Sequence, residues 1–312
     1  MTKILWGMLL CLCLTSSMQL AVKAQPKQKF KIDRPSHKEQ RYFYKSMLVD
    51  STDYKYLYGD SSDVYLLVKI ITVINAEADA KVLKVSLLGH EDVIEYTLKS
   101  CVKAIYTSSD GLEYAPVKTQ YDTLLKPNDV LVVDYEKKSI TVNHVSVDDS
   151  TTKKLKDLFM DSGYSSLDKF FGTDKTTRRI GEHWDISLKE MLNSFSKYYP
   201  KESIKGAHPV GSLDTATIHN VSCYKIDCDF SLANINNLLP KEVKNQFRID
   251  SNMVKTTFTT FVPLNANAHE QARQYIINSY SHFKANTQDA VSGLTDMIVR
   301  NKRIINCAFM NN

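Results

Sequence analysis

Residues 130–147, VLVVDYEKKSITVNHVSV, decide the fold. Two β-branched runs, 130–135 and 140–147, flank the polar residues 136–139, which is the pattern of a β-hairpin. Earlier runs with β-type alternation cover 54–58, 64–74, 81–88 and 94–98, with turn-forming residues after the first at 59–63. Consecutive hairpins at this spacing predict an antiparallel sheet.

The middle of the chain changes to a helical period. Residues 150–171 and 188–199 place apolar side chains three and four positions apart, and Pro200 ends the second run. Strand-like runs return at 216–230 and 253–262, and the last hairpin is expected to pair 296–299 with 304–310 around a turn at 300–303. Residues 265–285 fit either a helix or a strand.

This order predicts an α+β fold. We expect a large, curved, half-barrel-like antiparallel sheet with helices from the middle of the chain packed on one side. Residues 42–312 would form one domain, which is strand-rich over 42–149, helical over 150–200 and strand-rich again over 212–312. Residues 25–41 are polar and read as a flexible leader.

Residues 1–24 have the features of a secretory signal peptide. Lys3 precedes an apolar run over 4–14, and small residues end the segment at Ala24. We therefore expect cleavage after Ala24 and export to the periplasm, the cell surface or the medium. No later apolar run reaches the length of a membrane helix, so we expect no transmembrane segment after signal removal.

Charge and cysteine content narrow the function classes. The net charge of +5 would fall to +3 without Lys3 and Lys23, and the basic residues are scattered, which argues against nucleic-acid binding. Cleavage would also remove two of the six cysteines. Of the remaining four, Cys228 with Cys307 is the favoured disulfide, and buried free thiols are the alternative.

Catalytic, metal and cofactor motifs are missing from the sequence. Residues 269–273, HEQAR, begin like a zinc-protease helix but have Arg273 where the second histidine is needed. His183 can serve as a general base only if a carboxylate from elsewhere orients it. Trp184, the one tryptophan after residue 24, is alternatively a packing residue beside Gly181. We expect no metal and no cofactor.

Tyrosines form the second candidate site. Tyr54, Tyr56 and Tyr58 alternate along one expected strand and so share a face. They can act as a stacking platform for a ligand, or they can be ordinary half-buried residues of a pleated surface.

Three features together resemble a group of exported Bacteroidetes proteins of unknown function. They are the Lys-Ala-Gln end of the signal at 23–25, the Gly-Glu-His-Trp segment at 181–184 between two strand-rich halves, and the final hairpin at 296–310. The resemblance implies export and this architecture, and it implies no catalytic residue.

These observations favour an exported, non-catalytic binding protein or envelope-associated protein. Tyr54, Tyr56, Tyr58, His183 and Trp184 are its candidate ligand-binding residues. A small apolar ligand, a glycan or an envelope protein would be the partner. The alternatives are a secreted hydrolase with a site near His183, and a structural or adhesive surface protein with an exposed apolar patch.

Overall fold

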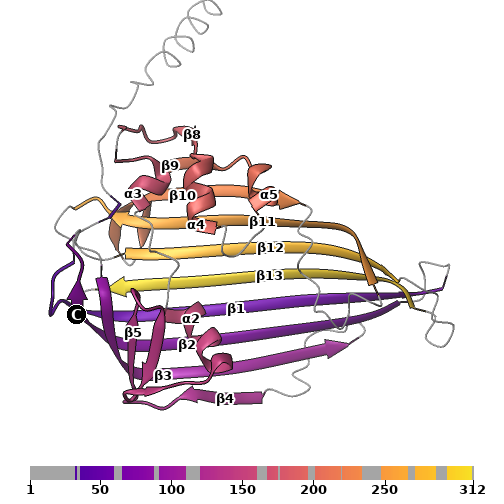
Figure 1. Cartoon of the computed structure of the whole chain (residues 1–312), viewed down its shortest axis with the longest axis horizontal. Helices are drawn as coiled ribbons and strands as arrows, with labels where there is room; N and C mark the ends of the chain where they lie inside the picture. The colour runs from indigo at the N-terminus through magenta and orange to yellow at the C-terminus, as the bar shows by residue number, and fades with distance from the viewer. Residues whose placement is uncertain are drawn as a thin grey trace, which may run out of the picture.

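The computed structural model describes residues 32–33, 36–59, 65–87, 91–109, 120–159, 167–174, 176–195, 201–218, 220–233, 247–265, 271–285 and 294–310. One antiparallel sheet dominates them (Figure 1). Its strands are β1 (Arg41–Tyr58), β2 (Tyr65–Val85), β3 (Glu91–Ser109), β4 (Gln120–Leu125), β5 (Val130–Asp134), β6 (Ser139–Val142), β7 (Val145–Ser146), β8 (His183–Asp185), β9 (Val210–Ile218), β10 (Val221–Ala233), β11 (Phe247–Pro263), β12 (Gln271–Ala285) and β13 (Leu294–Met310). The described helices are α2 (Asp149–Phe159), α3 (Leu167–Phe171), α4 (Leu188–Phe195) and α5 (Lys201–Lys205).

The sheet consists of two meanders that meet at the first and last strands. One edge begins with β7, β6 and β5 and continues through β3, β2 and β1, while β4 pairs separately with β3. The other meander runs from β8 in chain order to β13, which lies beside β1. The pairing of β1 with β13 extends from Phe43 opposite Met310 to Tyr58 opposite Leu294. It therefore joins the two meanders along almost the full length of both strands.

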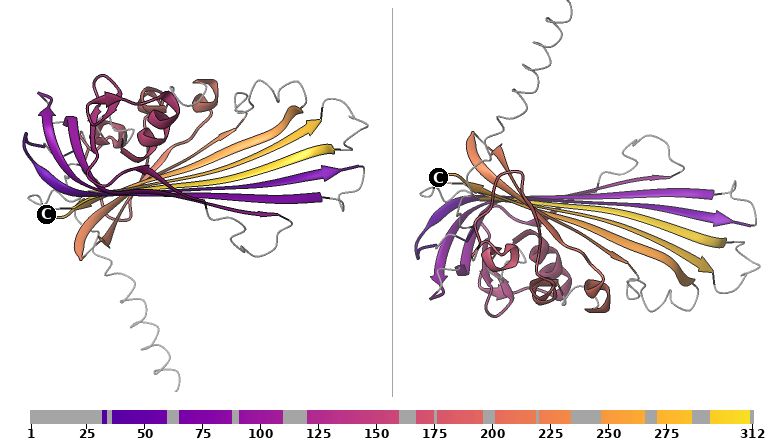
Figure 2. Two further views of the ribbon diagram at one scale, coloured as in Figure 1. Left: turned by 90° about the horizontal axis from the view of Figure 1, so that it is seen from below. Right: turned by 90° about the horizontal axis from the view of Figure 1, so that it is seen from above.

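The long strands divide the sheet into two ends. We call the end with Arg41 and Met310 proximal and the end with Tyr58 and Leu294 distal. Both views in Figure 2 show the helices over one side of the proximal half, while the distal half extends beyond them. In β1, alternate residues are buried as far as Leu48, and beyond it both faces are half-buried. We name the two faces of the sheet the helix-side face and the outer face; even-numbered residues of β1 lie on the helix-side face.

A first apolar cluster holds α2 against β1, β3 and β5. The ring centroid of Tyr44 lies 5.1 Å from that of Tyr96 and 5.5 Å from that of Phe159. The Tyr44 hydroxyl donates to the Leu158 carbonyl, and the Tyr135 hydroxyl donates to the Phe159 carbonyl at 2.9 Å. These bonds satisfy carbonyls of the last turn of α2, which have no partner within the helix.

A second apolar cluster lies under α3, α4 and α5 on β9, β10 and β11. Trp184 from β8 and Phe171 from α3 are among its members, and the Phe171 ring stacks on Phe258 of β11 with centroids 5.8 Å apart. Ile32, from the segment before β1, is also fully buried there. None of the described helices is long and apolar enough to cross a membrane.

The predicted hairpin is confirmed for β5 and β6, but residues 140–147 are not one strand, because Asn143 and His144, with positive φ of 51° and 65°, turn the chain into β7. Leu131 pairs with Val142 and Asp134 with Ser139, and Lys138 in the connecting turn has a positive φ of 56°. Antiparallel pairing holds throughout the described sheet, as expected from consecutive hairpins.

The predicted α+β class is wrong. The described helices have 5 to 11 residues each, whereas six strands have 15 to 21 residues, so the described part of the chain is mostly antiparallel sheet. The sequence pattern misses this because several short β-type runs belong to one strand. In β1 the polar residues 50–53 join two such runs, since Asp50 and Asp53 pair in register with Arg303 and Arg300 of β13.

The predicted final hairpin is also wrong. Residues 300–303 are the middle of β13, which continues without a turn between β1 and β12. Alternation places Arg300 and Lys302 on the outer face and Arg303 on the helix-side face, where Arg303 forms an ion pair with Asp157 of α2. Residues 271–285, which fit either element, form strand β12.

The expectation that no segment after the signal peptide crosses a membrane is wrong as well. It considered only apolar helices, whereas β-strands can also cross a bilayer. A strand needs only about 9–11 residues to cross a bilayer. Seven strands of this sheet exceed that length. Strand length therefore removes the basis for the exclusion.

Candidate ligand-binding face

The three candidate tyrosines lie on the distal half of β1, on the helix-side face. The rings of Tyr54 and Tyr56 stack with centroids 6.2 Å apart and planes 11° from parallel. Partial burial, followed by the neighbouring Tyr54 and Tyr58, raises the pKa of Tyr56. The phenol of Tyr56 therefore stays uncharged at neutral pH.

Apolar side chains from both neighbouring strands flank these tyrosines. Tyr54 lies opposite Val68 of β2 and Val299 of β13, and Tyr56 lies opposite Leu66 and Met297. Side chains directly opposite each other in a sheet are in contact range. We call the set of half-buried residues formed in this way the apolar platform; its members are Tyr54, Tyr56, Tyr58, Leu66, Val68, Ile70, Met297 and Val299.

The apolar platform carries no charge and ends at a polar band. From Thr52 to the distal end, none of the helix-side residues that the structure describes in β1, β2, β12 and β13 is charged. At the border toward α2, the Asn301 amide donates to Asp50 and, at 2.8 Å, to the Thr52 hydroxyl. The ion pair between Arg303 and Asp157 lies in the same band.

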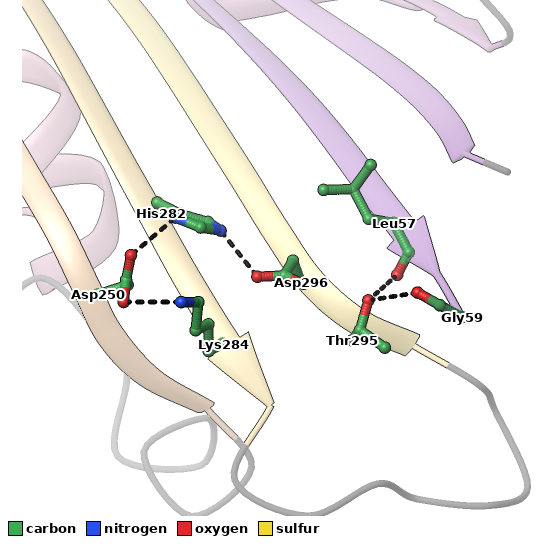
Figure 3. Close-up of polar contacts among 7 residues, drawn as sticks. All are labelled: Leu57, Gly59, Asp250, His282, Lys284, Thr295 and Asp296. Carbon is green, nitrogen blue, oxygen red and sulfur yellow. Dashed lines mark hydrogen bonds and ion pairs between the residues drawn. The ribbon is translucent and has the colours of Figure 1, made fainter. Parts of the chain in front are cut away.

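The Thr295 hydroxyl links β13 to β1 at the distal end of the platform. Thr295 Oγ1 lies 3.3 Å from the carbonyl oxygens of both Leu57 and Gly59 (Figure 3). The contact coincides with the irregularity in register between Leu57 and Tyr58. It fixes the position of β13 beside the last tyrosine.

The outer face of the same region is charged and ion-paired. His282 of β12 lies between two carboxylates, with Nδ1 3.1 Å from Asp250 Oδ2 and Nε2 2.8 Å from Asp296 Oδ1 (Figure 3). The Lys284 ammonium lies 3.2 Å from the other oxygen of Asp250. The network links β11, β12 and β13 through charged groups that are part-exposed to water. The described residues of the distal sheet therefore carry no charge on the helix-side face, whereas the outer face combines charged groups with apolar residues such as Leu57, Leu67 and Ile298.

Acid should weaken this network through Asp250. The hydrogen bond from Lys284, together with the charges of Lys284 and His282, holds the pKa of Asp250 below its usual range. Folding then favours the ionised carboxylate, so its contribution is present above about pH 4 and is lost as the pH falls through the lowered native pKa. We expect Asp250→Asn to lose less thermal stability than wild type between about pH 4 and pH 2. Asp214→Asn, at an exposed aspartate of β9, is the control. Identical acid profiles for Asp250→Asn and wild type would contradict the prediction.

His183 and Trp184 point in opposite directions from the short edge strand β8. Trp184 is only 8% exposed, its Nε1–H donates to the Phe171 carbonyl at 2.9 Å, and the Arg178 guanidinium covers its ring at 4.5 Å. His183 is exposed, and in the part of the chain that the structure describes it has no hydrogen bond or ion pair with a carboxylate. The geometry thus favours packing for Trp184 and gives no support to a hydrolase site at His183. Neither residue lies near the apolar platform, which is on β1, β2 and β13.

The favoured disulfide is wrong, because all four described cysteines are buried and none of them is in a disulfide. Cys228 lies on β10 and Cys307 on β13, so β11 and β12 separate them. Three strand spacings amount to about 14 Å, twice the Cα separation that a disulfide tolerates. Burial raises the pKa of the Cys101 thiol to about 12, which keeps it protonated and unreactive at neutral pH.

Among the described residues, no group of three or more His, Cys, Asp or Glu side chains can hold a metal ion.

The sequence alone did not show that residues of β2 and β13 lie beside the three tyrosines. The alternation of Leu66, Val68 and Ile70 is visible in the sequence and marks one face of a strand. Which face borders Tyr54 depends on the register, and the register with β13 pairs residues more than 200 positions apart.

Comparisons with known proteins leave the family open. No family model matches the chain, and no curated protein matches it. Among solved structures, the outer-membrane protein OprG from Pseudomonas aeruginosa is 9% identical, with 90% of this chain and 100% of that chain covered and a TM-score of 0.20. An outer-membrane channel from Pseudomonas putida is 7% identical, with 88% and 99% covered and a TM-score of 0.18. A mutant of the monoaromatic hydrocarbon channel TodX is 8% identical, with 93% and 98% covered and a TM-score of 0.12. At TM-scores this low, the likenesses carry no conclusion about the present chain.

Proposed function

We propose that this protein is a non-catalytic, exported protein of the cell envelope that binds a lipid-like amphiphile on the apolar platform. The observation that carries the proposal is the contrast between the two distal faces. Tyr54, Val68 and Val299 form an uncharged apolar surface, while His282 and its partners occupy the outer face. No described helix lies over the platform (Figure 2). An uncharged apolar surface that none of the described helices covers is a candidate binding site.

The size of the platform favours a lipid chain over a protein partner. Residues 52–58 extend for about 20 Å along β1, and three strands are about 14 Å wide, which gives an area of about 300 Å². A stable protein–protein interface buries about 800 Å² on each partner. A long acyl chain matches the length of the platform and needs no larger surface. The signal-like residues 1–24, which lie outside the described residues, support an envelope location.

Two adjacent isoleucines of β2 provide a matched test. Ile70 lies on the helix-side face within the platform, and Ile71 lies on the outer face; both are half-buried. We expect Ile70→Lys to weaken the binding of palmitate by at least about tenfold, because it places an ammonium group where the acyl chain must lie. Ile71→Lys should bind as wild type does. Titration of purified protein with palmitate and with methyl palmitate measures both affinities.

Thermal unfolding of each variant checks that the two lysines leave the fold equally intact. Loss of binding in Ile70→Lys alone supports the platform as the site. The proposal fails if wild type binds neither palmitate nor methyl palmitate, or if the two lysine variants bind with the same affinity.

A further inference from the structure

We infer that the outer face of the sheet, at the middle of its long strands, docks on an anionic lipid surface through Lys255, Arg300 and Lys302. All three residues are exposed, and they come from two strands, β11 and β13, on either side of β12. We call these three residues the basic patch. It lies on the face opposite the apolar platform, so the inference does not depend on the proposed amphiphile.

Strand register brings the three cations together. Asn278 of β12 pairs with Lys255 on one side and with Lys302 on the other, so the two lysines are two strand spacings, or about 10 Å, apart. Arg300 is two residues from Lys302 on the same face of β13 and lies opposite Tyr280. Like charges gathered on one face repel each other and destabilise a sheet unless a counter-charge is supplied.

The acidic side chains of this region are already paired elsewhere. Asp53, which lies in register with Arg300, is 3.6 Å from Lys69 instead. Asp250 and Asp296 hold His282 between them, and Asp250 also pairs with Lys284 (Figure 3). Asp229 of β10 accepts a hydrogen bond from Thr257 at 2.6 Å.

None of these carboxylates lies within ion-pair distance of the basic patch, and the one directly opposite it in the sheet, Asp53, pairs with Lys69. Within the described part of the chain, Lys255, Arg300 and Lys302 form no ion pair. Three unpaired cations spread over a sheet surface fit an array of phosphate groups better than one small anion. Anionic headgroups at a membrane surface supply that array, and each basic residue near such a surface contributes about equally to binding.

Vesicle binding tests the inference. We expect the protein to sediment with vesicles of phosphatidylglycerol and phosphatidylcholine but not with phosphatidylcholine alone, and to be released by salt. The triple variant Lys255→Gln, Arg300→Gln, Lys302→Gln should bind the anionic vesicles on the order of a hundredfold more weakly. The control variant replaces three exposed lysines elsewhere, Lys126, Lys138 and Lys205, with Gln and should bind within a few-fold of wild type.

Three results would overturn the inference. The first is equal binding to neutral and anionic vesicles, and the second is equal loss in the two triple variants. The third is displacement from the vesicles by inorganic phosphate at a concentration equal to that of the lipid phosphate, since this indicates a site for a small free anion. Palmitate binding by the triple variant of the basic patch is measured in parallel. A change in vesicle binding with unchanged palmitate binding concerns the basic patch and not the apolar platform.

Discussion

Trp184→Ala is expected to lower the free energy of unfolding by about 3–5 kcal/mol, which is typical of removing a buried tryptophan. The ring fills the second apolar cluster at 8% exposure, and its Nε1–H donates to the Phe171 carbonyl. Truncation leaves a cavity, an unpaired carbonyl and an Arg178 guanidinium without the ring that it covers. Urea unfolding followed by circular dichroism measures the change.

Gly211 provides a control that isolates the ring. A Cβ atom on Gly211 would lie 2.6 Å from Trp184 Cε2, closer than real contacts allow. Gly211→Ala should therefore cost about 1–3 kcal/mol in wild type and almost nothing in the Trp184→Ala background. Additive costs in the double variant would show that the ring does not occupy this position.

Asp168→Ala is expected to cost about 3 kcal/mol, because a buried carboxylate with three hydrogen bonds is lost. Asp168 accepts from the Ile32 amide at 2.9 Å, the Asp33 amide at 3.1 Å and the Thr173 hydroxyl at 2.6 Å. Asp33 reciprocates by accepting from the amides of Leu167 and Asp168 at the start of α3. The pair fastens the segment before β1 to the second apolar cluster.

Limited proteolysis together with urea unfolding tests whether the hydrogen bonds between Asp168 and the segment at Ile32 and Asp33 hold that segment in place. Asp168→Ala should unfold at lower urea and be cut faster near Ile32, whereas Asp174→Ala, at an exposed aspartate just after α3, should behave like wild type. Equal stability and equal cleavage in the two variants would show that the Asp168 hydrogen bonds do not hold Ile32 in place.

The sequence predicts local pairing well and long-range joining poorly. The hairpin of β5 and β6 is recognisable because both strands and the turn lie within residues 130–147. The length of β1 and β13 is not, because Asp50 and Arg303 look like turn residues until they are paired across the sheet and, for Arg303, with Asp157. Charged residues inside a strand can be distinguished from turn residues only when their partners on the neighbouring strands are known.

The candidate site shows the same division. Alternation alone places Tyr54, Tyr56 and Tyr58 on one face, and the structure has them there. The same alternation separates His183 from Trp184. Although the two residues are adjacent in the sequence, His183 faces solvent and Trp184 lies in the core. Val299 could not be assigned to the tyrosines, because that contact depends on the pairing of the first and last strands, and the contact of Val68 depends on the register between β1 and β2.

Photo-crosslinking with a palmitate analogue that carries a diazirine at the end of its chain tests the central claim most directly. Mass spectrometry of the labelled protein locates the chain on the sheet. Binding on the apolar platform predicts labels within residues 52–58, 66–70 and 297–301, competed by unlabelled palmitate and lost in Ile70→Lys. Labels confined to the helix-covered proximal half or to the outer face, or no competed label at all, would contradict the account.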